Sequence, residues 1–294
     1  YWVEITSPSP HVELELEEQR RYEATVFEVP RGNRSAAMVR VSRRDMGGDE
    51  LAIDWRDLPP GVSVEAHPVA GNYDQMPVLL HAEAEAPLGQ ALPTLVARRT
   101  DGDAELPTKF TSRTWMVRGQ NNRDMWNYLG HRPVVVVTET APFEIEIVEP
   151  KSPLVQRGTK NLRVVAKRKE GFDEAILVRM LYNPPGVSSN ASLRIKQGET
   201  EAEIPITANP NARVGDWKII VRGEANARGQ LVAATPFATL KVVPPYLAMT
   251  LPATTMEQGT STSMKVAVEQ LVPFAGEARV ELKGLPPGVT TDPV

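Results

Sequence analysis

The chain has no cysteine, few aromatic residues, no excess of positive charge and no long apolar run. Without cysteine it cannot form a disulfide framework, a thiolate metal site or a cysteine nucleophile. Its 33 basic residues are outnumbered by 37 acidic ones, so no basic field is available to attract a nucleic-acid backbone. The longest apolar run, Pro133–Val137, has the length of a strand and is far shorter than the roughly 18 residues of a membrane-spanning helix. We therefore expect no nucleic-acid partner and no membrane insertion.

Proline, by contrast, is abundant. The 294 residues include 26 prolines, against an average share of about 5%. This frequency disfavours long helices, because proline removes a backbone donor and clashes with the preceding turn. At roughly 100–150 residues per domain, the length allows two or three domains.

A PPG motif occurs three times, as LPPGV at 58–62, NPPGV at 183–187 and LPPGV at 285–289. One such motif would only mark a turn, but the residues before it repeat in phase. The positions 8, 6 and 4 residues before the first proline are apolar in every copy: Leu51, Ile53 and Trp55; Ile176, Val178 and Met180; Ala278, Val280 and Leu282. This repetition indicates three copies of one module, with Trp55 in a core position.

A second apolar triplet ends 18 residues before each PPG motif: Ala37, Val39 and Val41; Leu162, Val164 and Ala166; Met264, Val266 and Val268. Such period-two spacing is typical of a half-buried strand, with one set of side chains in the core and the other facing solvent. A glycine precedes each of these strands, at Gly32, Gly158 and Gly259. The pattern predicts an all-β fold of tandem antiparallel Ig-like β-sandwiches.

The repeat phase also predicts the domain organisation. We expect residues 1–10 to be the end of a preceding domain or a lead-in strand, 11–141 to form module 1 and 142–244 to form module 2. Residues 245–294 should form a partial module 3, which is too short to close a sandwich. Prolines at both junctions limit hinge freedom and predict a semi-rigid rod of modules.

Module 1 is longer than module 2 because of an insertion within 104–132. This stretch holds the candidate ligand-binding residues Phe110, Trp115, Trp126 and Tyr128. Aromatic side chains on an inserted loop can stack on sugars or be buried in a partner, or they can form a small core of the loop itself. Residues 122–129 are expected to form one or two helical turns.

The second module also carries a family resemblance. QRGT at 156–159, AKRKEGFDEA at 166–175, PPGV at 184–187, QGETEA at 197–202 and VGDW at 214–217 resemble the tandem Ig-like modules of large secreted bacterial proteins. Such modules often follow a bacterial pre-peptidase C-terminal domain and are similar to the NEW3-type sandwiches appended to hydrolases. YWVEI at 1–5 looks like the last strand of such a preceding domain. The resemblance implies a fold rather than an activity, because these modules are usually spacers, adhesive units or accessory domains.

No catalytic constellation is apparent in the sequence. His11, His67, His81 and His131 share no metal-ligand spacing, and no GxSxG motif is present. The strand alternation places His81 on the solvent side. Asp101-Gly102-Asp103 fits a hairpin turn better than a calcium site. We expect no catalytic residue, no metal and no cofactor.

Other polar motifs have simple explanations. Glu13, Glu15 and Glu17 lie on one face of a predicted strand, about 7 Å apart, and are expected to be solvated. Two glycosylation sequons, at Asn33 and Asn190, matter only in a glycosylating host.

These observations favour a non-enzymatic segment of a secreted, periplasmic or cell-surface protein. Its role would be to space or present neighbouring domains of the same chain. The alternative is an accessory binding module that holds a glycan or a protein ligand through the module 1 insertion.

Overall fold

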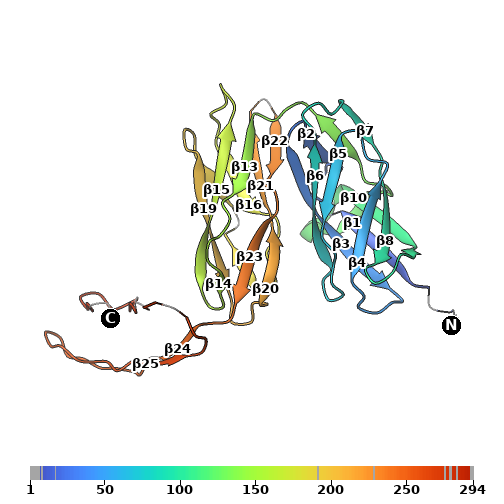
Figure 1. Ribbon diagram of the computed structural model, residues 1–294. Helices are drawn as coiled ribbons and strands as arrows, with labels where there is room; N and C mark the ends of the chain where they lie inside the picture. The colour runs from blue at the N-terminus through green and yellow to red at the C-terminus, as the bar shows by residue number, and fades with distance from the viewer. Residues whose placement is uncertain are drawn as a thin grey trace.

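The computed structural model describes residues 7, 9–16, 18–190, 192–227, 229–274, 276–277, 280–282 and 284–291. This part of the chain contains β-strands and one 3-10 turn, and no α-helix. Two β-sandwiches lie side by side and are followed by a thin two-stranded segment (Figure 1). The all-β expectation is confirmed. The lead-in strand expected at 1–10 falls mostly outside the described residues.

The first sandwich contains β1 (His11–Leu16), β2 (Phe27–Pro30), β3 (Arg34–Arg44), β4 (Leu51–Arg56), β5 (Val62–Ala66), β6 (Gln75–Ala82), β7 (Gly89–Ala91), β8 (Thr94–Arg99), β9 (Glu105–Leu106), β10 (Thr108–Arg118), β11 (Asp124–Gly130) and β12 (Val135–Thr138). Its largest sheet has the order β11-β10-β1-β3-β6-β5. Two three-stranded sheets, β2-β12-β7 and β4-β8-β9, complete the sandwich.

The second sandwich contains β13 (Phe143–Ile147), β14 (Leu154–Val155), β15 (Thr159–Arg168), β16 (Ile176–Met180), β17 (Val187–Ser189), β18 (Leu193–Ile195), β19 (Glu201–Ala208), β20 (Gly215–Ile219), β21 (Val221–Asn226), β22 (Gln230–Ala234) and β23 (Ala238–Val243). They form sheets β13-β15-β19-β17, β14-β23-β20 and β18-β16-β21-β22. The two sandwiches are built alike. β1 and β13 pair with β3 and β15, whereas β2 and β14 pair in parallel with the late strands β12 and β23.

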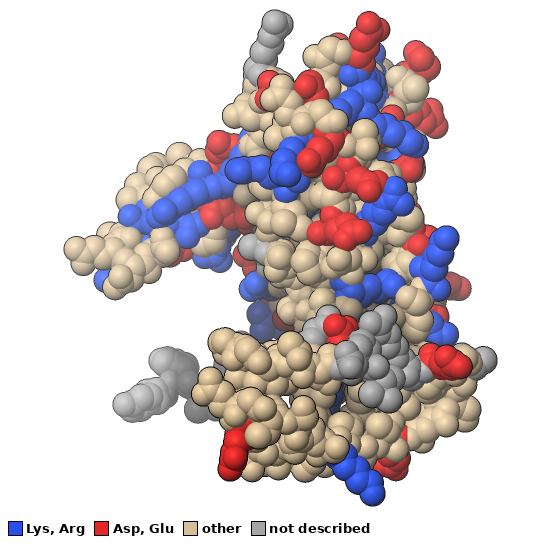
Figure 2. Space-filling model, turned by 90° about the vertical axis from the view of Figure 1, so that its left-hand side faces the viewer, with Lys and Arg blue, Asp and Glu red and all other residues tan. Residues whose placement is uncertain are grey.

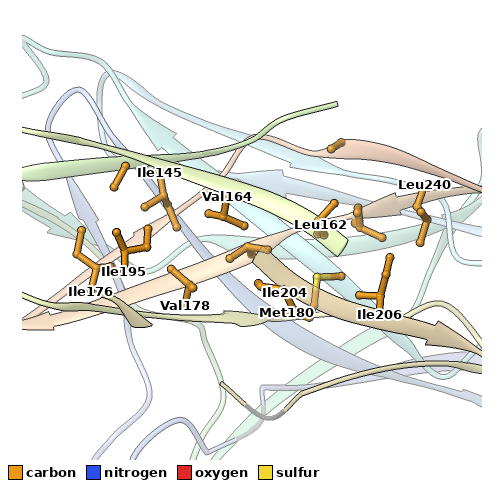
Figure 3. Packing of buried hydrophobic residues seen from close by; sticks show 14 of the residues in the cluster. Ile145, Leu162, Val164, Ile176, Val178, Met180, Ile195, Ile204, Ile206 and Leu240 are labelled. Atoms are coloured by element: carbon orange, nitrogen blue, oxygen red, sulfur yellow. The ribbon is translucent and has the colours of Figure 1, made fainter. Parts of the chain in front are cut away.

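The alternation in the sequence becomes two facing layers of apolar side chains. In the second sandwich β13, β15 and β19 supply one layer, and β16, β18 and β23 supply the other. Figure 3 shows their side chains pointing into the space between the layers: Ile145, Leu162, Val164, Ile176, Val178, Met180, Ile195, Ile204, Ile206 and Leu240. Each such burial contributes about 1.5–3 kcal/mol to stability. These positions therefore determine which face of each strand is inside.

The PPG motifs form tight turns of the same type. The backbone N–H of Val62 donates to the carbonyl of Pro59 at 3.1 Å, and that of Val187 donates to Pro184 at 2.8 Å. Gly61 and its counterpart in the second sandwich have φ of +73° and +79°. Proline followed by a residue with positive φ is the pattern of a type II turn, which glycine adopts without steric cost.

In both sandwiches the PPG glycine also packs against the loop that follows the next long strand. A Cβ placed on Gly186 would lie 2.5 Å from the Cα of Ala212, and one on Gly61 would lie 3.2 Å from the Cα of Ala86. The third copy makes the same turn but lacks this contact, because nothing lies within 4 Å of a Cβ placed on Gly288. The PPG turn itself needs only its own residues, whereas the contact of its glycine with the following loop requires a folded sandwich.

The segment after the second sandwich has no core of its own. β24 (Leu247–Thr250) pairs with β25 (Ala267–Gln270), and no described residue after Val242 is buried. The strand expected around Val280 and Leu282 is not formed at the described positions, and Ala278 lies outside them. Among the described residues, no second sheet covers the apolar faces of this segment, so its side chains are not buried as the matching side chains of the two sandwiches are.

The expected rod is wrong, because the two sandwiches pack side by side instead of end to end (Figure 1). A separate apolar cluster lies between them. Ala36 and Leu79 come from the outer face of the first sandwich, and Ile220 and Ala234 come from the second; each is at most 3% exposed. Leu181, Tyr182 and Phe237 pack around this cluster. These apolar side chains lie outside the two cores and hold the sandwiches together.

Aromatic rings extend the contact between the sandwiches. Tyr73 and Trp217 meet edge to face with their ring centroids 5.6 Å apart, and the Arg213 guanidinium lies 5.3 Å from the Tyr73 ring centroid. His67 and Phe237 form a second edge-to-face pair at 4.9 Å. Trp217 packs against the core of the second sandwich and also contributes to this interface.

Two buried polar groups cross the same interface. The Asn33 side chain, which is 2% exposed, donates to the backbone carbonyl of Phe143 at 2.8 Å. Arg222, which is 3% exposed, donates through Nη1 to Gln19 at 2.7 Å. Burial lowers the pKa of the Arg222 guanidinium, and the carboxylate of Glu224, 3.0 Å from its Nε, opposes that shift. A buried polar group that loses its partner costs about 1–3 kcal/mol, so these bonds favour one relative placement of the sandwiches.

The ionisation of Tyr182, which packs around the apolar cluster between the sandwiches, depends on that interface being formed. Burial raises the pKa of its phenol to about 12, whereas an unperturbed tyrosine ionises near pH 10. Because the pKa of Tyr182 is higher in the folded than in the unfolded chain, the buried neutral phenol contributes fully to the stability of the fold below about pH 10. This contribution is lost as pH rises through about 12. In an alkaline titration of phenolate absorbance we expect one late step that Tyr182→Phe removes. A late step that persists in Tyr182→Phe would contradict this assignment.

Candidate functional site

Residues 108–130 form a hairpin, here named the β10–β11 arm, at one edge of the first sandwich. β10 pairs in parallel with β1 from Thr108 to Ser112 and then runs on with β11 as its antiparallel partner. β11 is therefore the end strand of the six-stranded sheet. The arm lies within the stretch that the sequence marks as an insertion.

The helical turns expected at 122–129 are not formed. Asp124–Gly130 is a strand, and only Gln120–Asn122 forms a 3-10 turn. Asn121 and Asn122 have φ of +55° and +59°, and the N–H of Arg123 donates to the carbonyl of Gln120 at 3.2 Å. Positive φ at both central residues is the type I′ hairpin turn, for which asparagine is favoured. The Asn-Asn pair, followed by strand-forming aromatic residues, was the signal for a hairpin.

The structure separates the four predicted aromatic residues into three environments. Phe110 is 6% exposed and belongs to the core of the first sandwich, so its ring offers no contact surface. Trp115 is half-buried on the arm. Trp126 and Tyr128 are 63% and 68% exposed on β11. Only the last two present open rings.

Trp115 is covered by arginine side chains. The Arg118 guanidinium lies 4.0 Å from its ring centroid, and that of Arg113 lies 5.7 Å away. Arg118 is also ion-paired with Glu18, and both of these side chains are largely buried. A cation over an indole is stabilised by the ring quadrupole. Through Arg118 and its ion pair with Glu18, Trp115 links the arm to the connection between β1 and β2.

Trp126 and Tyr128 lie on the same face of β11, two residues apart. Tyr128 is directly opposite Thr114 on β10, so the two side chains lie on the same face of the sheet. Phe110 lies four residues before Thr114 on β10 and points to that face as well. That face is the core side of the sheet, since Thr114 and Phe110 are both under 9% exposed. The two exposed rings therefore continue the inner face of the sheet past the point where the opposing layer covers it.

The arm concentrates exposed apolar side chains. Six of the seventeen large hydrophobic residues that are exposed in the described part of the chain belong to it: Met116, Val117, Met125, Trp126, Tyr128 and Leu129. Figure 2 shows an arm that leaves the body at the height of β10 in Figure 1, with a row of Lys and Arg side chains along it and a largely uncharged outer end. An apolar patch with a basic border is typical of an interaction surface.

The connection between β1 and β2 links the arm to the second sandwich. Glu18 forms the ion pair with Arg118, and Arg21 donates to the Asn122 side chain at 2.9 Å. Between them along the chain, Gln19 accepts the bond from Arg222. One short segment therefore contacts both the arm and the interface.

A groove of about 220 Å³ lies where the chain passes between the sandwiches, lined by Glu28, Pro30, Thr138, Glu139, Thr140, Ala141, Gln230, Leu231 and Val232. Small-molecule sites usually occupy about 300–1,000 Å³. This groove is smaller, and its lining contains two carboxylates but no histidine, lysine or arginine.

In the described part of the chain, no three His, Asp or Glu side chains are close enough to hold a metal ion. His81 is half-buried instead of exposed, and desolvation, with Arg34 nearby, lowers its pKa. A hydrogen bond from Arg44 lowers the pKa of the Glu13 carboxyl. Asp101-Gly102-Asp103 lies in the turn between β8 and β9.

Comparison with known proteins gives likenesses to solved structures only. No family model matches the chain, and no curated protein matches its sequence. Fibronectin(III)-like modules of Clostridium thermocellum CbhA are 9% identical, with 79% of this chain and 94% of that one covered and a TM-score of 0.23. The D00-D0 domain of intimin is 12% identical, covering 77% and 98% at a TM-score of 0.24.

Domains 4–9 of the surface layer protein SbsC are 13% identical, with 83% of this chain and 34% of that one covered and a TM-score of 0.27. The fold of this chain is defined by its own strand order and its two cores. Among the described residues, no helix has the length and apolar character needed to cross a membrane.

Proposed function

We propose that this chain is a non-enzymatic structural segment of a secreted, periplasmic or cell-surface protein, in which it spaces or presents neighbouring domains. The observation that carries the proposal is the buried interface that fixes the two sandwiches side by side. Its apolar cluster and the Asn33 and Arg222 bonds define one placement. A pair held in this way presents whatever is attached to it in a set direction. The resemblance of the repeat to modules of secreted bacterial proteins supports the location.

A distance measurement tests the fixed placement. Because the chain has no cysteine, spin labels can be attached uniquely after Ser63→Cys on the first sandwich and Arg194→Cys on the second, both at exposed positions. We expect a single narrow distribution of distances between the labels. A broad distribution would mean that the sandwiches move independently, and it would overturn the proposed presenting role. Hydrolytic activity abolished by one substitution would overturn the non-enzymatic part.

We infer that the same chain has a second function, as a binding module that uses the β10–β11 arm. The observation that favours it is the exposure of Trp126 and Tyr128 on one face of a strand. Buried aromatic anchors dominate most binding energies, and an isolated chain gains nothing from keeping two such rings in water. The partner is a protein or a glycan.

A further inference from the structure

The open edge of β11 is the feature of the arm that points to one kind of partner. Among the described residues, β11 pairs with β10 alone, so one row of its backbone N–H and C=O groups has no strand beside it. An edge of this kind is a template for an added strand. A peptide satisfies such a row of groups, whereas a glycan does not reproduce their spacing.

Two other end strands, β5 and β13, carry charged side chains along their length, whereas β11 carries one charge, at its hairpin end. β5 carries Glu65, and β13 carries Glu144 and Glu146. Charged side chains on an edge strand discourage pairing with another chain. β11 reads DMWNYLG, with its single charge, Asp124, at the hairpin end and no proline or lysine. From Trp126 to Gly130 the edge is therefore uncharged.

The charges that flank this edge are mostly basic. The arm carries Lys109, Arg113, Arg118 and Arg123 and a single acidic residue, Asp124, within a chain of net charge −4. Arg113 is paired with Asp124, and Arg118 is paired with Glu18. Lys109 lies opposite Glu13 on β1, which leaves Arg123, beside the hairpin end of β11, as the arm's cation without an acidic partner among the described residues. Its charge favours an acidic partner, because complementary potentials steer association and disfavour like-charged competitors.

We propose that β11 binds an extended, acidic peptide segment of another protein as a seventh strand of the sheet. Apolar side chains of the segment pack on Trp126 and Tyr128, and an acidic side chain faces Arg123 at the hairpin end of the arm. This inference rests on the second proposed function, binding through the arm, and does not depend on the presenting role.

A peptide selection against the full 294-residue chain tests the proposal. A phage library of random 12-residue peptides is selected on the wild-type chain and counter-selected on the double variant Trp126→Ala and Tyr128→Ala. We expect enriched sequences that alternate apolar and acidic residues. Synthetic versions should lose at least tenfold in affinity to the double variant. Methylation of alternate backbone nitrogens in the peptide should cause a comparable loss, because it removes the donors of a paired strand.

The matched control is Leu88→Ala with Leu92→Ala, which removes two exposed apolar side chains, 48% and 49% exposed, elsewhere on the same sandwich. It should leave the affinity unchanged, and the unfolding temperature of each variant should match that of the wild type. The inference is overturned if no peptide is enriched or if the enriched peptides are basic. It is also overturned if backbone methylation leaves the affinity of the peptides unchanged. Binding in a glycan array that the double variant abolishes would keep the arm as a binding surface while overturning the peptide strand.

Discussion

Gly186→Ala is expected to destabilise the second sandwich by about 2–5 kcal/mol. A side chain at this positive φ costs about 1–2 kcal/mol, and forcing atoms into a packed site adds about 1–3 kcal/mol. The second cost arises because the new Cβ would lie 2.5 Å from the Cα of Ala212 and 2.9 Å from its nitrogen. Both are backbone atoms, so no side-chain rotation relieves the clash. Urea unfolding followed by tryptophan fluorescence measures the effect.

Gly198→Ala is the matched control for this experiment. Gly198 has φ of +74°, in the same sandwich, and nothing lies within 4 Å of a Cβ placed there. Its substitution should cost only the conformational part, about 1–2 kcal/mol. Equal losses for the two variants would show that the alanine loop yields and that docking of the PPG turn contributes nothing.

Leu79→Asp is expected to separate the two sandwiches while each remains folded. Leu79 is 3% exposed in the interface, but it lies out of phase with the core positions Val78 and Leu80. An unpaired buried carboxylate costs several kcal/mol, and the interface also loses about 1.5–3 kcal/mol of apolar burial. We expect a larger radius of gyration, two unfolding transitions in place of one, and a broadened distance distribution between labels on Ser63→Cys and Arg194→Cys.

Two further variants make this result decisive. Ala234→Asp places a charge in the same cluster from the other sandwich and should give the same phenotype. Leu88→Asp, at a position 48% exposed, should leave the labels at their original separation. If both interface variants keep the narrow distance distribution, the apolar cluster does not hold the sandwiches together.

The repeat phase predicted the cores well because period-two alternation follows directly from strand geometry. Val164 and Val178 are both fully buried, as their register with the PPG motif required. The third copy shows the limit of this reasoning. Val268 occupies the same register as Val41 but is 51% exposed, because burial depends on an opposing sheet that the strand itself does not encode.

The interface was missed although its sequence signal was present. Leu181 stands at the solvent-side position three residues before the PPG motif, where the other copies have Arg56 and Lys283. The change from charged to apolar in one copy marks a surface that is covered in the folded chain. In the first sandwich Ala36 and Leu79 stand at the positions where the second has Asn161 and Pro205. Which surfaces meet depended on the path of the junction, which no local pattern specifies.

The arm lies within the stretch 104–132 that the sequence marks as an insertion, but a strand and a 3-10 turn stand where helical turns were expected. Aromatic content alone did not distinguish Phe110, which faces the core, from Trp126, which faces solvent. Both residues lie on the core-side face of the sheet, and the opposing layer covers Phe110 but does not reach Trp126. Two irregularities near Trp115 and Val117 also alter the ladder register locally. Alternation cannot be extrapolated through such bulges.

The burial of Asn33 has a consequence for how the protein is produced. Asn33 begins a sequon, yet its side-chain nitrogen donates to Phe143 inside the interface and is inaccessible once the chain is folded. A eukaryotic secretory pathway adds glycans to this motif, and addition before folding would replace one hydrogen of the side-chain nitrogen and place a bulky sugar between the sandwiches. Material from such a host would carry a steric block to domain docking, whereas a host without this modification yields the native pair.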